Sequence, residues 1–289
     1  MASIEVPPDW ENLTFSAMAG VILVIGAPDT GKTTFARYLY KRLMEHHQRV
    51  GFLDGDMGQA TLGPPTTMTL ALAGAPEESW PPCGPRFRTF VGSVSPRGHM
   101  LATVVGAHRL VQRATENGAT AIVYDTTGLV AAEQGGGALK LALGDLLEPG
   151  VVIGLQRGTE LEHLLVPLRC SGRTRAVDRS VTLAVQRRDV ATRRAYRAEQ
   201  FRRAFEGSRR MEVDWSGRAV VPGPSFARHR LVALEDAQGF VLGLGIVTGR
   251  DSHRQAVELY TPVPSLDGVD TLHLGDVTLD PETFCDQPL

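Results

Sequence analysis

Several classes of protein are excluded by what this sequence has little of. It contains only three cysteines among 289 residues. Because none of them forms a CxxC pair, neither a disulfide framework nor a cysteine zinc site is expected. No uninterrupted apolar stretch reaches the roughly 18 residues of a membrane-spanning helix, and residues 1–9 lack the basic and apolar regions of a signal peptide. We therefore expect a cytoplasmic protein with no membrane partner.

Lysine is also scarce, with three residues against 27 arginines, and the formal net charge is −2. This overall balance gives no general attraction to nucleic acid, so any basic site must be local. One such concentration exists, because residues 169–210 hold thirteen arginines and four acidic residues. The alternative interpretation is a solvated helix face or a surface for acidic partners, since charge runs are often merely exposed.

The apolar pattern predicts the fold. Short apolar runs indicate buried parallel strands, and apolar residues at helical spacing between them indicate covering helices. Strands that alternate with helices are typical of an α/β fold with a doubly wound, mostly parallel sheet. Residues 64–85 are expected to form a loop. The predicted strands are 21–25, 50–53, 120–124 and 151–155, and the predicted helices are 33–46, 99–117, 139–147 and 188–205.

After the proline-rich turn at 222–224 the pattern changes to short strands between turns. The predicted strands of this part are 231–234, 241–247, 256–260 and 271–274. We therefore expect two domains, an α/β domain over residues 1–222 and a small β-rich domain over residues 223–289.

Residues 26–33 read Gly-Ala-Pro-Asp-Thr-Gly-Lys-Thr and fit the GxxxxGK[ST] pattern of a phosphate-binding loop, or P-loop, in full. The glycines let backbone N–H groups turn toward phosphate oxygens, and the helix N-terminus that follows adds positive potential. Lys32 is expected to reach the β- and γ-phosphates and the Thr33 hydroxyl to bind Mg²⁺. The predicted cofactors are therefore ATP, or another nucleoside triphosphate, and Mg²⁺. The predicted phosphate-binding residues are Gly26, Asp29, Thr30, Gly31, Lys32, Thr33 and Thr34.

Two acidic clusters follow predicted strands. Asp54-Gly-Asp56-Met-Gly-Gln59 comes after one strand and Asp125-Thr-Thr-Gly128 after another. Because the carboxyl ends of parallel strands meet at one crevice, both clusters are expected to face the P-loop. One carboxylate can position Mg²⁺ while another takes the proton from an attacking hydroxyl. The alternative is that these aspartates only cap the following turns.

The segment Asp125–Gly128 also fits the DxxG motif of GTPases. A GTPase normally adds a guanine-reading Asn-Lys-x-Asp, and this sequence contains no such tetrapeptide. The GTPase interpretation is therefore disfavoured but not excluded.

These motifs occur in the order of a known family. The P-loop, the DxDxGQ of residues 54–59, the segment Gly63–Thr67 and the turn Asp125–Gly128 together resemble the polynucleotide 5′-hydroxyl kinases. That family contains the kinase subunit of the eukaryotic pre-mRNA cleavage complex and the pre-ribosomal-RNA kinases. The resemblance covers about residues 20–210 and includes Ser95–His99, which is similar to the family's Ser-Pro-x-Gly element. Many families share the P-loop, whereas the DxDxGQ at this distance is more specific.

The resemblance implies an enzyme that transfers the γ-phosphate of ATP to a 5′-hydroxyl of RNA or DNA. It implies that Asp56 is the general base and a metal contact, and that Gly63–Thr67 is a clasp over the terminal nucleotide. It also implies a lid at about residues 169–210, in which the helix 188–205 matches the family's lid helix. The implied catalytic residues are Lys32, Asp56, Arg188 and Arg193, and the implied metal ligands are Thr33 and Asp56. The implied substrate-binding residues are Asp54, Gln59, Pro65, Thr66, Thr67, Arg97, Thr127 and Gly128.

The sequence departs from the family in two places. Many members have a tryptophan after the Asn-Thr-x-Gly turn, where this chain has Leu129. A stacked aromatic ring contributes ~1–3 kcal/mol to the binding of a base, so the substrate preference stays open. Some relatives also carry an N-terminal β domain, which the roughly twenty residues before the first predicted strand are too few to form. Two alternatives remain: a P-loop kinase acting on a small molecule, and a non-enzymatic binding module stabilised by ATP.

The remaining candidates are single residues. Arg97 and His99 either contact substrate phosphates or lie on the surface at the start of a helix. The three tryptophans, Trp10, Trp80 and Trp215, are expected to be packing anchors rather than stacking platforms.

Overall fold

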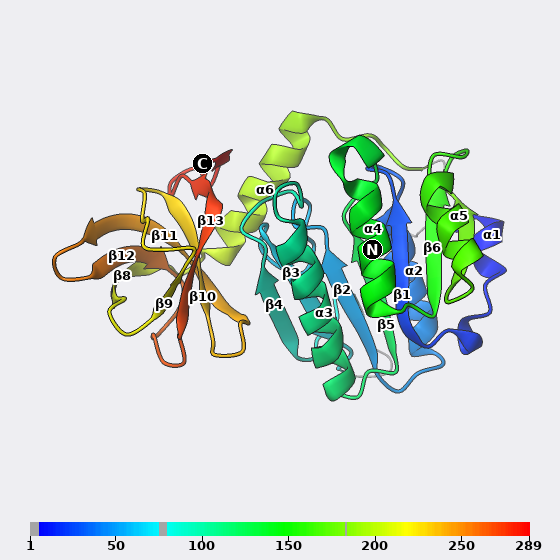
Figure 1. Cartoon of the computed structure of the whole chain (residues 1–289), viewed down its shortest axis with the longest axis horizontal. Helices are drawn as coiled ribbons and strands as arrows, with labels where there is room; N and C mark the ends of the chain where they lie inside the picture. The colour runs from blue at the N-terminus through cyan, green and yellow to red at the C-terminus, as the bar shows by residue number, and fades with distance from the viewer. Residues whose placement is uncertain (1–5, 75–79, 183) are drawn as a thin grey trace. The chain divides into compact units, whose positions relative to one another are not determined.

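A seven-stranded sheet carries the predicted motifs (Figure 1). The computed structural model describes residues 6–74, 80–182 and 184–289. The strand order is β4-β3-β2-β5-β1-β6-β7. Five neighbouring strands pair in parallel, in the order β2, β5, β1, β6 and β7. This arrangement confirms the α/β fold with a mostly parallel sheet. The strands are β1 Gly20–Gly26, β2 Val50–Gly55, β3 Thr67–Leu72, β4 Arg86–Phe90, β5 Ala121–Thr126, β6 Val151–Gln156 and β7 Arg175–Ser180.

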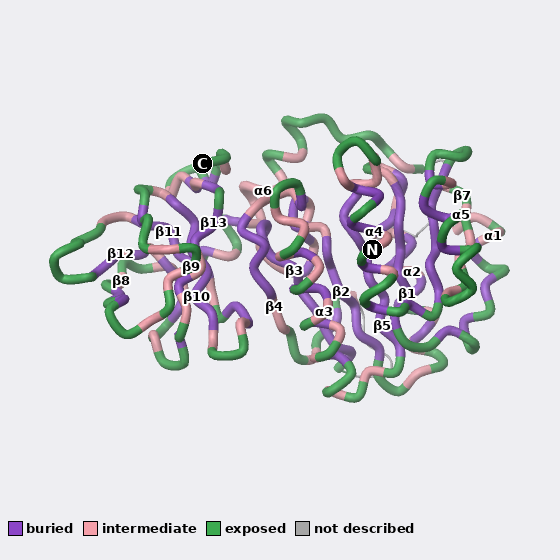
Figure 2. Tube along the Cα trace, viewed as in Figure 1, coloured by how far each residue is buried: buried purple, intermediate pink, exposed green. Residues whose placement is uncertain are grey.

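Helices cover both faces of this sheet, with α4 in front of β1 and α2 behind it in Figure 1. Burial on both faces explains why the central strands are continuous apolar runs rather than alternating ones. Every residue of β2, β5 and β6 is buried, as the purple traces in Figure 2 show. The helices are α1 Pro8–Glu11, α2 Lys32–Met44, α3 Met100–Glu116, α4 Gly136–Leu147 and α5 Glu162–Ser171, with short 3₁₀ turns η1 Phe15–Ala17 and η2 Ala132–Gln134.

The expectation of a loop over residues 64–85 is wrong for β3. Its sequence, Thr-Met-Thr-Leu-Ala-Leu, is buried throughout, and it pairs antiparallel with β2. Threonine is β-branched and suits a strand. The prolines and glycines that flank this short run obscure it in the sequence.

The arginine-rich stretch over residues 169–210 is several elements rather than one. It contains the end of α5, the whole of β7, the helix α6 Val190–Ala204 and the start of β8 Arg209–Asp214. The predicted helix therefore begins later than Arg188, because the Asp189 side chain accepts a hydrogen bond from Thr192 N at 2.7 Å and caps the helix there. The strand β7 was not expected, since its alternating Arg175-Ala-Val-Asp-Arg-Ser is half exposed at the sheet edge.

A second sheet follows α6, as the sequence predicts. Its strand order is β14-β13-β10-β11-β12-β8, with β9 paired to β13. Successive residues of β10 alternate between two apolar clusters, because Val232 and Leu234 lie in one while Leu231 and Ala233 lie in the other. This strand is therefore buried on both faces. The strands not yet bounded are β9 Ala219–Val221, β10 Arg230–Glu235, β11 Val241–Asp251, β12 Ala256–Thr261, β13 Thr271–Leu279 and β14 Asp286–Pro288.

Contacts divide the chain into two compact units that do not follow sequence order. The first unit comprises residues 1–56, 69–86 and 103–188, and the second comprises residues 57–68, 87–102 and 189–289. Two segments from the α/β part, 57–68 and 87–102, thus belong with α6 and the second sheet. The boundary between residues 222 and 223 that the sequence predicts stays a prediction.

The single-residue expectations are confirmed for the tryptophans. Trp10 and Trp215 are buried, and the indole N–H of Trp10 donates to Ser180 O at 3.0 Å. The Trp80 ring packs edge-on against Phe52 at 4.6 Å. The three cysteines, all within the described residues, are exposed and form no disulfide. In the part of the chain that the structure describes, no helix has the length and apolar character needed to cross a bilayer.

Candidate active site

The P-loop joins β1 to α2 through two left-handed residues. Asp29 has φ 54° and Gly31 has φ 77°, a region that favours glycine. The Thr30 hydroxyl and the Lys32 ammonium both donate to Ala27 O, at 2.9 and 2.7 Å. Lys32 is only 7% exposed. The loop thus curls around its own lysine, with backbone N–H groups at the start of α2.

The first glycine of the loop is required by close approach. A Cβ on Gly26 would lie 2.7 Å from the Thr30 hydroxyl oxygen and 2.9 Å from Leu155 O. Any side chain there would push the loop away from β6. The sequence motif and the packing therefore demand the same residue at this position.

Two carboxylates sit side by side at the carboxyl ends of β2 and β5. The parallel register pairs Asp54 directly with Asp125, and their exposed fractions are 2% and 1%. Burial, and next the neighbouring Asp54, raise the pKa of Asp125 to about 7, while the Thr33 hydroxyl and Lys32 act to lower it. Burial and neighbouring charges that shift a pKa in this way are typical of functional sites.

The residues present fit a divalent cation. Both carboxylate oxygens of Asp125 are buried and neither accepts a well-formed hydrogen bond in the structure, although the Thr33 hydroxyl is near enough to influence its pKa. Buried polar groups normally have partners, so this carboxylate has capacity for a ligand. The described residues contain no group of three acidic, histidine or cysteine side chains placed for a metal. Mg²⁺ in phosphate-transfer sites often takes one or two carboxylates plus the substrate phosphates.

The turn after β5 packs against the P-loop. A Cβ on Gly128 would lie 3.0 Å from Pro28 N, and the Thr126 hydroxyl donates to Val24 O at 2.7 Å. Thr127 O accepts from the ammonium of Lys140 at 2.7 Å. The sequence correctly predicts that this turn faces the P-loop, but the contact is between backbones.

Lys140 was not predicted as part of the site. This residue of α4 is fully buried, and burial, followed by repulsion from Lys32, lowers its pKa to about 7. A lysine on an apolar helix face, in a chain with three lysines, is a signal that could have revealed it. Lys140 anchors the turn that carries Thr127.

The predicted substrate-binding residues divide between the units, since Asp54, Thr127 and Gly128 lie in the first and the remaining ones in the second. The segment 57–68 folds on itself, since Thr66 N donates to Met57 O at 2.9 Å and the Thr67 hydroxyl to Pro64 O at 2.8 Å. Thr66 has φ 72°, and its carbonyl accepts from Val91 N and Gly92 N at 2.9 and 3.2 Å. The predicted clasp is thus bound to the strand end that leads into the Ser-Pro-Arg-Gly loop.

Two candidates of the second unit have structural partners. The Gln59 amide donates to Gly58 O at 2.6 Å and, more weakly, to Arg193 O at 3.4 Å, which joins the segment 57–68 to α6. His99 lies 3.4 Å from a carboxylate oxygen of Asp276 on β13. Arg97 is exposed.

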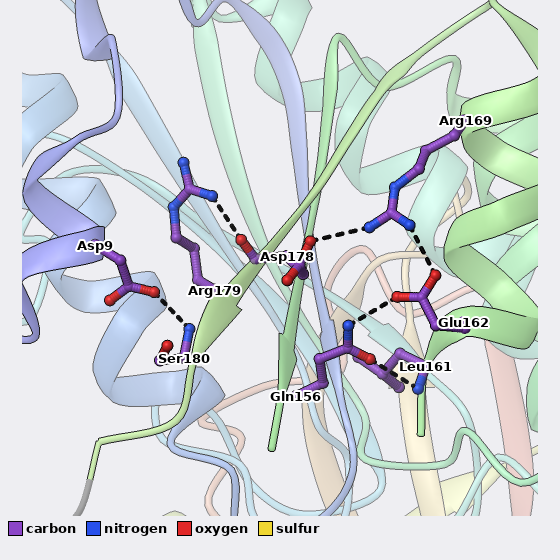
Figure 3. Close-up of polar contacts among 8 residues, drawn as sticks. All are labelled: Asp9, Gln156, Leu161, Glu162, Arg169, Asp178, Arg179 and Ser180. Atoms are coloured by element: carbon purple, nitrogen blue, oxygen red, sulfur yellow. Dashed lines mark hydrogen bonds and ion pairs between the residues drawn. The ribbon is translucent and has the colours of Figure 1, made fainter. Parts of the chain in front are cut away.

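The arginines at the start of the basic stretch belong to the framework (Figure 3). Arg169 donates to Glu162 at 2.7 Å and to Asp178 at 3.0 Å, and Glu162 accepts from the Gln156 amide at 2.8 Å. This network ties β6, α5 and β7 together. The first part of the predicted lid, up to residue 180, forms the end of α5 and the strand β7. Arg188 directly precedes the α6 cap Asp189, and Arg193 lies in the first turn of α6. The lid itself stays a prediction.

Comparison with known proteins agrees with the motif order. Residues 26–207 match the family model described as mRNA cleavage and polyadenylation factor CLP1 P-loop. The chain belongs to this family. The resemblance predicted from the motifs is therefore confirmed, and every predicted site residue lies inside the CLP1 P-loop match.

Relatives and solved structures extend the comparison to the whole fold. A polyribonucleotide 5′-hydroxyl-kinase of Pyrococcus horikoshii is 29% identical over 216 residues, which cover 71% of this chain and 56% of that protein. A polyribonucleotide 5′-hydroxyl-kinase of Pyrococcus furiosus is 24% identical, covering 94% of this chain and 92% of that one. The solved Clp1p–Pcf11p complex shares the fold, with a TM-score of 0.66 at 13% identity over 91% of this chain and 75% of the solved chain.

Proposed function

We propose that this protein is a polynucleotide 5′-hydroxyl kinase that uses ATP and Mg²⁺. The observation that carries the proposal is the buried pair Asp54 and Asp125, in register beside the P-loop residues Lys32 and Thr33. A phosphate-binding loop with adjacent carboxylates is the arrangement that phosphoryl transfer needs. The acceptor is proposed from family membership and from the names of the relatives.

The nucleotide side holds the triphosphate of ATP. Backbone N–H groups of residues 26–34 bind the phosphate oxygens, and the Lys32 ammonium, already held at the loop by Ala27 O, neutralises the charge that develops during transfer. Lys140 keeps the Asp125–Gly128 turn against this loop. The chain thereby pre-organises its positive groups before the nucleotide binds.

The same side holds the cation. Thr33 and Asp125 have the oxygen donors that Mg²⁺ prefers, and Asp54 lies beside Asp125. Asp56, which the resemblance implies as a metal ligand together with Thr33, donates its backbone N–H to Asp54 Oδ1 at 3.3 Å. When bound, Mg²⁺ supplies charge neutralisation on the phosphates. Asp125 must be ionised to act as a ligand, and its pKa of about 7 means that cation binding competes with a proton.

The acceptor side activates and orients the 5′ end. Asp56 takes the proton from the 5′-hydroxyl as its oxygen attacks the γ-phosphorus, and the bond to the β-phosphate oxygen breaks to release ADP. Arg188 and Arg193 stabilise the charge on the transferring phosphate. The remaining predicted residues, Gln59, Pro65, Thr66, Thr67, Arg97, Thr127 and Gly128, position the terminal nucleotide.

Label transfer tests this proposal. The purified protein is incubated with γ-labelled ATP, Mg²⁺ and short single-stranded RNA or DNA that ends in a 5′-hydroxyl. The control is the same oligonucleotide already phosphorylated at its 5′ end. The proposal expects label only on the 5′-hydroxyl oligonucleotides, and the ratio between RNA and DNA measures the preference that Leu129 leaves open.

The other outcomes distinguish the alternatives. Nucleotide binding without label on any oligonucleotide would contradict the polynucleotide acceptor and favour a small-molecule kinase if ATP is still hydrolysed. Bound nucleotide that never turns over would favour a binding module.

A further inference from the structure

The second sheet forms one unit with the segments that carry Gln59, Arg97 and Arg193, whereas the proposed acceptor residues Thr127 and Gly128 lie in the first unit. The family match ends at residue 207, so β8 and the strands that follow it lie outside the matched range. Nevertheless α6, the segment 57–68 and the segment 87–102 form one compact unit with this sheet. The contacts of each segment show how it is held.

The C-terminal half of α6 is part of the core of the sheet. Phe201 and Phe205 are buried in the apolar cluster that also contains Leu279 and Phe284. The Phe205 ring stacks on Tyr260 with an interplanar angle of 6°. This end of the helix therefore cannot move independently of the strands.

An ion pair fixes the middle of α6. The Arg197 guanidinium donates through Nε and Nη2 to the two carboxylate oxygens of Asp286 on β14, at 2.8 and 3.0 Å. The two side chains are only 12% and 7% exposed. Paired, planar contacts of this kind define orientation as well as distance.

The α6 residues that contact the second sheet lie on the same helix face as Arg193, a proposed catalytic residue. Residues four apart lie on one face of a helix, so Arg193, Arg197, Phe201 and Phe205 form one row along α6. The next row holds the segment 57–68, because the Tyr196 hydroxyl donates to Ala60 O at 2.9 Å and the Gln200 amide to the Tyr196 hydroxyl at 2.6 Å. The ion pair is thus one helical turn from Arg193, on the same face.

The segment 87–102 is held by the same sheet. Phe90 lies in the cluster with Phe201 and Phe205, and Gly92 O accepts from Asp276 N at 2.8 Å. A Cβ on Gly275 would lie 3.0 Å from the Phe90 ring. The strand β13 is therefore in direct backbone contact with the loop that leads to Arg97.

We propose that Arg197 and Asp286 are a positioning pair, through which the second sheet orients Arg193 for phosphoryl transfer. The inference rests on the proposed kinase function and deepens it. Neither residue touches the reactants in this account. Small displacements of a transfer group can reduce the rate by about a hundredfold, so loss of the pair should act mainly on the chemical step.

Kinetics of single and double variants test the inference. Arg197→Met keeps the aliphatic stem and Asp286→Asn keeps the shape, while each removes the ion pair. Each should lower kcat for phosphorylation of a 5′-hydroxyl oligonucleotide by about 10–100-fold, with the dissociation constant for ATP unchanged. Arg197→Lys should restore part of the rate. Adding Arg197→Met to Arg193→Gln should cause little further loss, because the pair acts through Arg193.

A matched control separates positioning from stability. Val257 is fully buried in the cluster on the opposite face of the same sheet, so Val257→Ala should lower the Tm without lowering kcat at a temperature where all variants are folded. Two results would overturn the inference, provided that the wild-type protein is an active kinase. One is that the kcat losses of Arg197→Met and Arg193→Gln multiply in the double variant. The other is that Asp286→Asn leaves kcat unchanged. An inactive wild-type protein would overturn the proposed function itself, and the inference with it.

Discussion

The proposed functional residues are brought together in different ways in the two units of this molecule. In the first, the P-loop is one continuous stretch between β1 and α2, and Asp54 and Asp125 are neighbours through strand register. In the second, Gln59, Arg97 and Arg193 come from three separate segments held by a common sheet. A nucleotide site built from local geometry can be recognised from short motifs. An acceptor site built from long-range packing can change its substrate through contacts far from the motifs.

Of the substitutions that distinguish the nucleotide site from the acceptor site, the one at Lys32 is expected to have the largest effect. Lys32→Met removes the cation that the P-loop holds against Ala27 O, so both nucleotide binding and label transfer should fall, transfer by about a thousandfold or more. Calorimetric titration with ATP and the label assay measure the two losses. Lys41→Met is the matched control, because Lys41 lies exposed on the same helix and should leave both unchanged.

Substitution of Arg193 should reduce phosphoryl transfer without reducing ATP binding. Arg193→Gln is expected to lower kcat by about 10²–10³-fold, since an arginine that stabilises the transferring phosphate contributes mainly in the transition state. The affinity for ATP alone should stay the same. Arg194→Gln changes the exposed neighbour on α6 and should have little effect. Equal losses in the two variants would indicate a general charge effect.

A pH-dependent trade-off is expected at Asp125. Its pKa rises from 3.8 to about 7 on folding. The protonated carboxyl therefore adds its full share to the free energy of unfolding below pH 4, and this stabilisation is lost as the pH rises through 7. Each pKa unit corresponds to about 1.4 kcal/mol. Asp125→Asn should therefore stabilise the nucleotide-free protein at pH 8 by a few kcal/mol (~2–4) and much less at pH 4, while abolishing transfer.

Urea denaturation without nucleotide or Mg²⁺ measures this difference. Asp145→Asn is the control, because Asp145 is exposed and paired with Arg173 on the surface. A stability gain for Asp125→Asn that does not depend on pH would mean that ionisation of the buried carboxylate is not its cause.

The smallest effect is expected in the polar network of Figure 3. Arg169 is partly exposed and bridges Glu162 and Asp178. Arg169→Gln should lower the free energy of unfolding by about 0.5–1 kcal/mol and leave kcat unchanged, as measured by denaturation and by label transfer. A large loss of kcat would contradict this structural role and would support the lid role that the sequence predicts for Arg169.

The same contrast explains what the sequence could and could not predict. Strands such as β1 and β5 and the site residues Lys32 and Asp54 follow from apolar runs and from what comes directly after them. Lys140 could not be assigned because its partner, Thr127 O, is a backbone atom brought to it by the sheet. The strand β7 is hidden because at a sheet edge its exposed positions carry arginine. The Arg197–Asp286 pair joins residues 89 positions apart, which no local pattern reveals.

The most direct test of the division between the two sides is the variant Asp56→Asn, with ATP binding and label transfer measured on the same preparation. Asp56 follows β2 directly and ends the first of the three segments of the first unit. The next residues along the chain, 57–68, carry proposed acceptor residues. If Asp56 activates the 5′-hydroxyl, the variant should bind ATP with wild-type affinity and transfer no detectable label to a 5′-hydroxyl oligonucleotide. An equal loss of ATP binding and transfer would contradict that role and place Asp56 with the nucleotide-holding residues.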